Sequence, residues 1–248
     1  MKTRRKPTDS NKADYCVQYG AVMGLVTDLE LKGNQFANAS TFFFVAYLIA
    51  ELPTGLALNK VPAGKWLGIN VTLWGVATAC IAAAKGYRSL LAARIFLGIF
   101  EAAIAPCLML LGSQWYTKSE QSPRFSFWYC GLGTGQMIGS LVSFGFQHAP
   151  VTGFAGWQAM FVTLGVVTIV VGLITTFFMP DSPLTARFLN DAERTALLQH
   201  VAENRTGVVN RHFSGGQILE IFTDPQMWLL SILVISVSKL DRSTEPNN

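Results

Sequence analysis

The chain has 248 residues, of which 50% are hydrophobic and only 14% are charged. Ordinary soluble domains carry about 25% charged residues, so this composition excludes that class and indicates an integral membrane protein. The net charge of +4 comes largely from a terminal tail and from alternate loops, so we expect no nucleic-acid partner.

The first segment of the chain is rich in lysine and arginine, and we predict a cytoplasmic tail over residues 1–14. The apolar segment that follows, Tyr15–Thr27, is only about a dozen residues long, a length more typical of a re-entrant or buried segment than of a span. We interpret it as an incomplete first helix. It must still cross the membrane if the basic N-terminal tail is to lie on the same side as the basic loops.

Five longer apolar blocks follow, each with about the 20 residues that cross a hydrocarbon core. They are Phe36–Leu58, Trp66–Ala84, Leu90–Leu111, Phe125–Phe146 and Trp157–Met179. Lysine and arginine gather in the N-terminal tail, in the loops after the first and third blocks, and after Met179, but are sparse in the alternate loops. By the positive-inside rule, this pattern predicts a cytoplasmic N-terminus.

The C-terminal quarter of the chain is polar and mixed in charge over residues 181–225, which predicts a cytoplasmic connector of amphipathic helices. Pro180 ends the last long block, and Asp191 is a candidate cap for a helix through "AERTALLQHVAEN". Met227–Ser238 is again short, so we predict a truncated seventh helix and tail over 226–248. The expected fold is all-α, a polytopic helix bundle over residues 15–180.

Three ionisable side chains, Glu51, Arg94 and Glu101, interrupt the apolar blocks. Burying such a group costs about 2.5–3.5 kcal/mol on insertion scales, so we expect them to face a bundle interior or an aqueous cavity. Arg94 and Glu101 are two helical turns apart, about 10 Å along one face, too far to pair directly. One hypothesis is that Arg94 attracts an anionic or amide-rich solute while Glu101 or Glu51 exchanges a proton. The alternative is that all three only brace neighbouring helices.

Two neutral polar residues are weaker candidates. Asn70 and Gln136 would line a polar cavity if they face inward, but interhelical hydrogen bonds explain them equally well.

Small residues recur every four positions in the fourth long block, at Gly131, Gly135, Gly139 and Ser143. A nucleotide-binding glycine motif needs a preceding strand, and this one lies within an apolar span. The spacing instead predicts a smooth helix face for close packing. No nucleophile–base pair and no metal-ligand spacing is present in the sequence, so we expect no cofactor, no metal and no enzymatic activity.

Several stretches together resemble the N-terminal half of fungal major facilitator transporters of the anion:cation symporter type, the allantoate permease-like group. These stretches are "VTDLELKGNQF", "NKVPAGKW", "RIFLGIFEAAIAP", "QWYTKSEQSPR" and "PDSPLTARFLNDAER". The resemblance implies two six-helix bundles that rock around a central cavity in the plasma membrane. It also implies proton symport of a small organic anion or amide, of the ureide, carboxylate or vitamin class. Arg94 and Glu101 match the fourth-helix motif, which implies roles in gating or coupling.

Departures from that group affect both ends of the chain. Tyr19 runs directly into Gly20, as if the centre of the first helix were skipped, and the seventh helix is abandoned after "DPQMWLL". A site between two halves is incomplete with one half, so we expect transport only if a second transporter half or a second copy supplies the other wall. The alternatives are an inactive partner of a full-length permease and a non-functional gene-model fragment.

Overall fold

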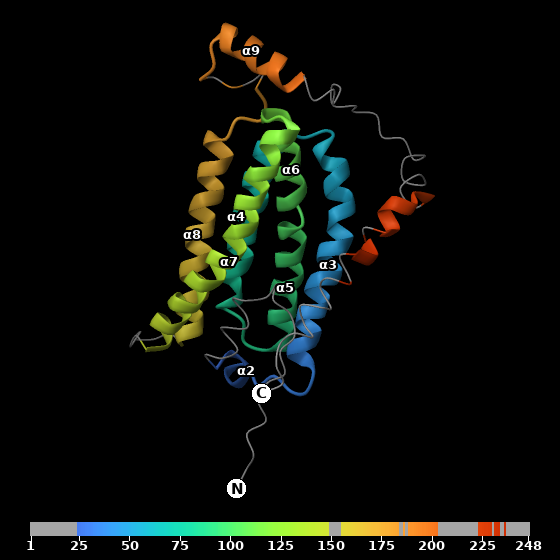
Figure 1. Ribbon diagram of the computed structural model, residues 1–248. Helices are drawn as coiled ribbons and strands as arrows, with labels where there is room; N and C mark the ends of the chain where they lie inside the picture. Colours follow the sequence, from blue (N-terminus) through green and yellow to red (C-terminus); the bar gives the residue numbers. More distant parts are fainter. Residues whose placement is uncertain are drawn as a thin grey trace. The chain divides into compact units, whose positions relative to one another are not determined.

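The computed structural model describes residues 24–148, 155–183, 186, 188–202, 223–229, 231–233 and 236. The described residues form helices and no strands, which confirms the expected all-α fold. The helices are α2 (Leu25–Asp28), α3 (Gln35–Leu58), α4 (Ala63–Ile81), α5 (Tyr87–Glu101), α6 (Ile104–Trp115), α7 (Lys118–His148), α8 (Gly156–Phe178) and α9 (Asp191–Ala202) (Figure 1).

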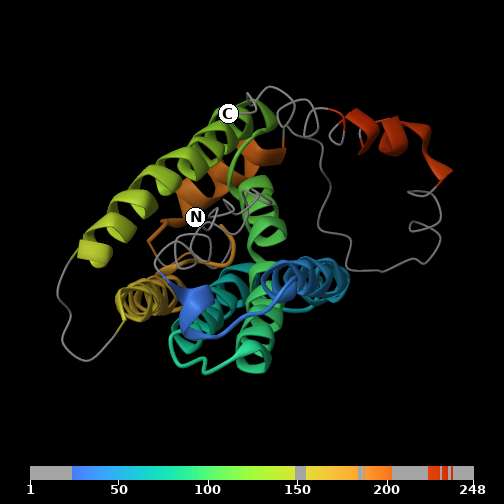
Figure 2. The same ribbon diagram turned by 90° about the horizontal axis from the view of Figure 1, so that it is seen from below.

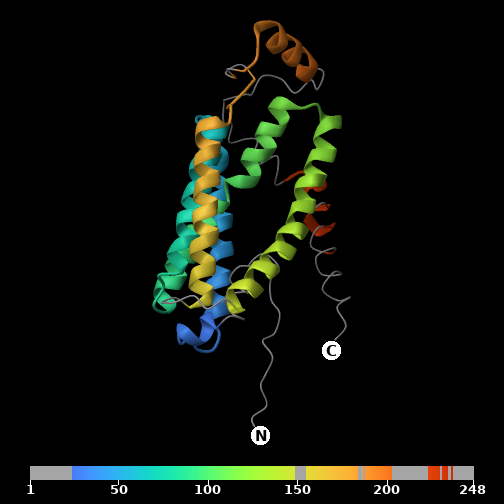
Figure 3. The ribbon, with the colours of Figure 1, turned by 90° about the vertical axis from the view of Figure 1, so that its left-hand side faces the viewer.

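The chain divides into two units, residues 1–207 and 208–248. In the first unit, α4 packs along α8 and α3 packs along α5, with α4 also contacting α5 and α6. Seen along the bundle, α3, α4, α5 and α8 lie side by side while α7 crosses obliquely (Figure 2). Helices α7 and α8 are close at the His148 end of α7 and diverge toward its Lys118 end (Figure 3).

The α4–α8 pair is built on glycines. A Cβ atom at Gly75 of α4 would lie 2.9 Å from the carbonyl oxygen of Gly165, and one at Gly172 of α8 would lie 2.5 Å from the backbone nitrogen of Thr72. Either helix backbone therefore fills the space that a side chain would need. Small residues that allow such close approach are typical of helix pairs in membranes, where apolar burial alone provides no driving force.

Within the predicted Leu90–Leu111 block, two turn residues, Ala102 and Ala103, separate α5 from α6, although both keep helical φ and ψ angles. The cause is Pro106, which has no N–H to donate to the carbonyl of Ala102 and whose ring clashes with that carbonyl. Both alanines at the break are fully buried. Glu101 is consequently the last residue of α5 rather than a mid-helix residue.

Three described helical stretches are long and apolar enough to cross a membrane: Gln35–Leu58, Tyr87–Trp115 and Gly156–Phe178. The other two predicted blocks also lie in long helices, the 19-residue α4 and the 31-residue α7. Helix α7 begins in the polar stretch "KSEQSPR", which lies outside the predicted block Phe125–Phe146.

The remaining predicted segments are described in part. Within Tyr15–Thr27, residues 15–23 lie outside the described residues, and Leu25–Thr27 belong to α2. The last residue of α2, Asp28, accepts a 2.7 Å hydrogen bond from the Trp157 indole through its carboxylate. Helix α9 begins at Asp191, one residue before the start that a cap at Asp191 predicts, and has no buried residue. In the second unit, residues 225–229 and 231–233 are helical.

Candidate functional site

Arg94 is buried in the interface between α3 and α5. Its side chain is 1% exposed, and its guanidinium carbon lies 5.6 Å from the centre of the Phe43 ring on α3. Gly98, one turn further along α5, makes this placement possible, because a Cβ there would lie 2.5 Å from the Phe43 carbonyl oxygen. A desolvated cation over an aromatic face gains about 2 kcal/mol from the ring quadrupole. The α3–α5 interface therefore holds one positive charge against an aromatic wall.

Tyr47 connects the two candidate carboxylates of the same interface. The phenol on α3 interacts electrostatically with Glu51 on its own helix and with Glu101 at the end of α5. Glu101 is half-buried and Glu51 is exposed. Two of the three predicted ionisable residues, Glu51 and Glu101, thus lie close enough to one tyrosine to act on it electrostatically. Tyr47 itself was not among the residues predicted from the sequence. The signal was its spacing, since residues four apart on a helix are neighbours on one face.

The neutral candidates lie on other helices. Asn70 of α4 is 6% exposed, and its side-chain amide donates a 2.8 Å hydrogen bond to the Trp66 carbonyl of its own helix. Gln136 lies on α7 and is half-buried. A bond within one helix explains the burial of Asn70 without a cavity, whereas a cavity role for Gln136 stays a prediction.

The predicted packing face of α7 has no neighbour at two of its positions. A Cβ at Gly131 or Gly135 would meet no atom of the described residues within 4 Å, while Ser143 near the other end is buried. Gly139, between them, is half-buried. This gradient follows the divergence of α7 from α8 (Figure 3). Close packing at Gly131 and Gly135 stays a prediction.

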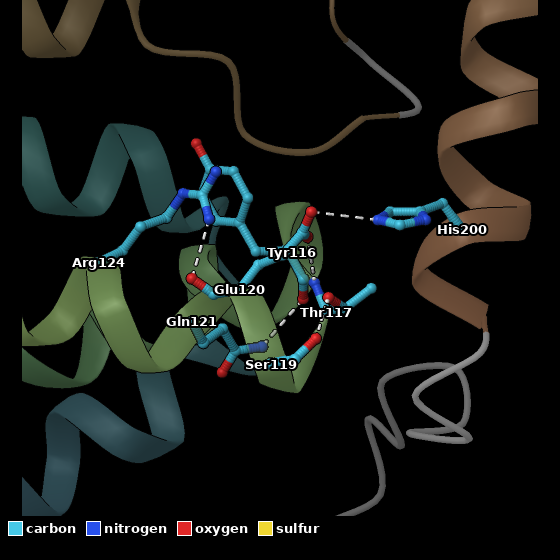
Figure 4. A network of polar contacts seen from close by, with 7 residues as sticks. All are labelled: Tyr116, Thr117, Ser119, Glu120, Gln121, Arg124 and His200. Atoms are coloured by element: carbon cyan, nitrogen blue, oxygen red, sulfur yellow. Dashed lines mark hydrogen bonds and ion pairs between the residues drawn. The ribbon is translucent and has the colours of Figure 1, made fainter.

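A second polar cluster lies where α6 passes into α7 (Figure 4). The backbone N–H of Thr117 donates to the Glu120 carboxylate at 3.0 Å, and the other carboxylate oxygen lies 3.3 Å from His200 Nε2 on α9. The hydrogen bonds from the Thr117 backbone and side chain, together with His200, lower the pKa of Glu120 against a smaller opposing effect of desolvation. This arrangement caps α7 and attaches α9 to it.

The chain matches known proteins over most of its length. Residues 15–238 match the family described as the Major Facilitator Superfamily. The chain is 38% identical to the thiamine pathway transporter THI73 of Saccharomyces cerevisiae, over 90% of this chain and 42% of that protein. It is 31% identical to the allantoate permease of the same yeast, over 87% of this chain and 40% of the permease.

A further relative comes from Schizosaccharomyces pombe. Its uncharacterized transporter C417.10 is 32% identical over 88% of this chain and 44% of the transporter. The chain therefore spans less than half the length of the curated relatives that it matches.

Proposed function

This chain belongs to the major facilitator superfamily, an integral-membrane family of transporters and not of enzymes, and on that premise we propose that it forms one half of a proton-coupled pathway for a small organic anion or amide. In this fold, substrate sites lie between two halves, and rocking of the halves alternates the access. In this proposal a second half or a second copy supplies the other wall of the pathway.

Arg94 is the residue that attracts the solute in this proposal. A guanidinium presents a planar fork of N–H donors that matches a carboxylate or an amide carbonyl. The name of one relative, the allantoate permease, supports this choice of solute, since allantoate is a carboxylate with ureido groups. The observation that carries the proposal is the 1% exposure of Arg94 in an interface of two apolar helices that also holds Glu101.

The proton is carried by the carboxylates beside Tyr47. Glu101 ends α5 at the helix break, where a change in the position of α6 alters its surroundings. Glu51, on the exposed side of α3, is the second candidate site for the proton. Tyr47 joins them as a group that both donates and accepts a hydrogen bond. Asn70 and Gln136 are secondary candidates for the solute path.

We place the N-terminus in the cytoplasm and the protein in the plasma membrane. The basic loops support this orientation, because Lys60 and Lys65 flank the start of α4 while Lys118 and Arg124 flank the start of α7. Both helix starts lie at the same end of the bundle (Figure 1). That end is the cytoplasmic one by the positive-inside rule.

Uptake by cells tests the proposal. Labelled allantoate and a panel of ureides, carboxylates and vitamins are supplied to cells that express the 248-residue chain, alone and with the C-terminal half of a relative. We expect flux of at least one solute, and we expect Arg94→Gln and Glu101→Gln to reduce it by at least tenfold while Arg88→Gln, at the exposed start of α5, leaves it unchanged. Unaltered flux in Arg94→Gln would leave only the bracing role.

A second candidate function rests on the open face of α7. Gly131 and Gly135 have no described neighbour, and Phe127 is 82% exposed on the same helix. An exposed apolar helix with small residues suits docking against another membrane helix. In this alternative the chain binds a full-length permease without transporting. Co-purification that is lost in Gly135→Leu, with no uptake by the chain under any pairing, would support it.

A further inference from the structure

An aromatic cavity of about 460 Å³ lies where the end of α6, the start of α7 and the end of α8 meet. Five aromatic side chains contribute to its wall: Trp115, Tyr116, Phe125, Trp128 and Phe188. The rings of Trp115 and Phe188 are stacked, with centroids 6.1 Å apart. This volume is typical of a pocket for a small organic ligand. Neither the pathway residues Arg94 and Glu101 nor the Glu120–His200 contact lines it.

Arg124 supplies the positive charge of this cavity. Its guanidinium carbon lies 3.9 Å from the centre of the Tyr116 ring, and Nη1 donates to the Glu120 carbonyl at 2.8 Å (Figure 4). A guanidinium has five N–H donors, so this bond leaves most of them for another acceptor. Among the residues that the structure describes, Arg124 forms no ion pair with a carboxylate, whereas Arg194 pairs with Asp191 and His200 with Glu120.

The depth of the cavity is fixed by the helices that form it. Two of the stretches long enough to span a membrane end beside it, one at Trp115 and the other at Phe178. The cavity therefore lies where the hydrocarbon core gives way to the headgroup region. Tryptophan and tyrosine are enriched at this level, because their rings are apolar while their N–H and O–H groups reach water. At this depth the aromatic side chains can contact the apolar part of a ligand while Arg124 binds its anionic part.

We propose that this cavity binds one anionic phospholipid, with an acyl chain among the aromatic rings and the phosphate on Arg124. The apolar walls disfavour a fully hydrated small anion, and the single unneutralised guanidinium favours an anionic over a zwitterionic lipid. Arginine suits the phosphate because its planar fork donates two parallel hydrogen bonds. The lipid would join α6, α7 and α8 at the end where α7 diverges from α8, and this inference does not depend on transport.

Native mass spectrometry of the purified, delipidated chain tests the proposal. The probes are dioleoyl phosphatidylserine, dioleoyl phosphatidylcholine, oleate alone and glycerophosphoserine alone. We expect one tightly held phosphatidylserine, bound at least about tenfold more tightly than each other probe. The reason is that phosphatidylcholine has no net negative charge, oleate has no phosphate and glycerophosphoserine has no acyl chain. Equal affinity for phosphatidylcholine would show that the net charge of the lipid is not recognised, and equal affinity for oleate or glycerophosphoserine would show that a chain or a headgroup alone is enough; each result would overturn the proposal.

Two charge variants separate this site from general attraction of lipids to a basic surface. Arg124→Gln is expected to weaken phosphatidylserine binding about tenfold, the usual loss for a charge-assisted hydrogen bond. The matched control is Lys118→Gln, which removes the same charge from an exposed residue of the same helix that does not line the cavity. Equal weakening by both variants would show that only the surface potential matters.

A third variant fills the cavity and leaves its charge in place. A Cβ at Gly112 would lie 3.1 Å from Cζ of Phe125. The side chain of Gly112→Val would therefore occupy space that the lipid acyl chain needs. We expect this variant to lose phosphatidylserine while it keeps the helix content of the native chain by circular dichroism. If Arg124→Gln does not fold, Arg124→Lys replaces it, with an expected intermediate affinity. Native binding in both Gly112→Val and Arg124→Lys would refute the proposal.

Discussion

The carboxylate of Asp181 accepts a 3.1 Å hydrogen bond from the backbone N–H of Lys65, 116 residues earlier in the chain. Lys65 lies in the first turn of α4, whose N-cap position is held by Pro62, a residue without a side-chain acceptor. Asp181, three residues after the end of α8, therefore caps α4 from another part of the chain. Gly64 leaves room for this contact, since a Cβ there would lie 3.1 Å from the same carboxylate oxygen.

Removal of this cap should destabilise the bundle. We expect Asp181→Ala to lower the free energy of unfolding by about 1 kcal/mol, the usual effect of a lost N-cap. Thermal unfolding in detergent measures the change. Asp191→Asn is the matched control, because Asp191 is 97% exposed and its ion pair with Arg194 contributes little. Equal losses in both variants would show that the Asp181 contact has no special role.

Helix pairing between α4 and α8 should not tolerate a side chain at Gly172. Because a Cβ there meets Thr72 at 2.5 Å, Gly172→Ala should cost about 1–3 kcal/mol through overpacking. Gly133 on α7 gives the control, since a Cβ there meets no described atom within 4 Å. Gly133→Ala should leave the unfolding temperature unchanged or raise it. A stable Gly172→Ala protein would mean that the two backbones are further apart than this structure has them.

The cap that Glu120 provides at the start of α7, and with it the contact to α9, should weaken in acid. The pKa of Glu120 is lowered in the folded protein, first by the Thr117 backbone N–H, so the ionised carboxyl stabilises the fold. That contribution is complete above the ordinary value of 4.5 and is lost as the pH falls through the lowered folded-state pKa. Melting curves should show that Glu120→Gln is less stable than the native chain at neutral pH and that the two converge in acid. Glu30→Gln, far along the chain, should not reproduce this convergence.

Coupling of flux to protons should depend on Tyr47. If its phenol assists proton exchange between Glu51 and Glu101, Tyr47→Phe should keep solute binding but reduce flux and alter its dependence on external pH. Uptake measured across a range of pH values gives the profile. Tyr129→Phe on α7 is the control, because that ring is 60% exposed. An unchanged profile in Tyr47→Phe would exclude the tyrosine from the proton path.

Much of the fold was predictable because lipid imposes a simple length rule on apolar blocks. Each of the five predicted blocks lies largely in helix, although Trp66–Ala84 runs three residues past the end of α4. Helix α9 begins at Asp191, the residue predicted to cap it. The division of α5 from α6 was missed even though Pro106 was visible, since a proline within a span is tolerated in many membrane helices. Whether a proline divides such a helix depends on the tertiary structure, because neighbouring helices must bury the break.

The pairing of helices was less predictable. The regular four-residue repeat at Gly131 drew attention to α7, whereas the close backbone contacts at glycines form between α4 and α8 and, at Gly98, between α5 and α3. A pattern of small residues shows that a face is smooth, but it does not identify the partner. The charged candidates were easier to predict, because Arg94 and Glu101 stand out in an apolar sequence. The phenol of Tyr47 resembles any other aromatic residue in a span until the structure places α5 beside it.

Pro106 leaves the carbonyl of Ala102 without its helical hydrogen-bond donor, within a span that runs from Tyr87 to Trp115. Ala102 and Ala103 nevertheless keep right-handed helical φ and ψ angles, and both are fully buried. Protein rather than hydrocarbon therefore surrounds the turn between α5 and α6, so the freed carbonyl is never exposed to lipid.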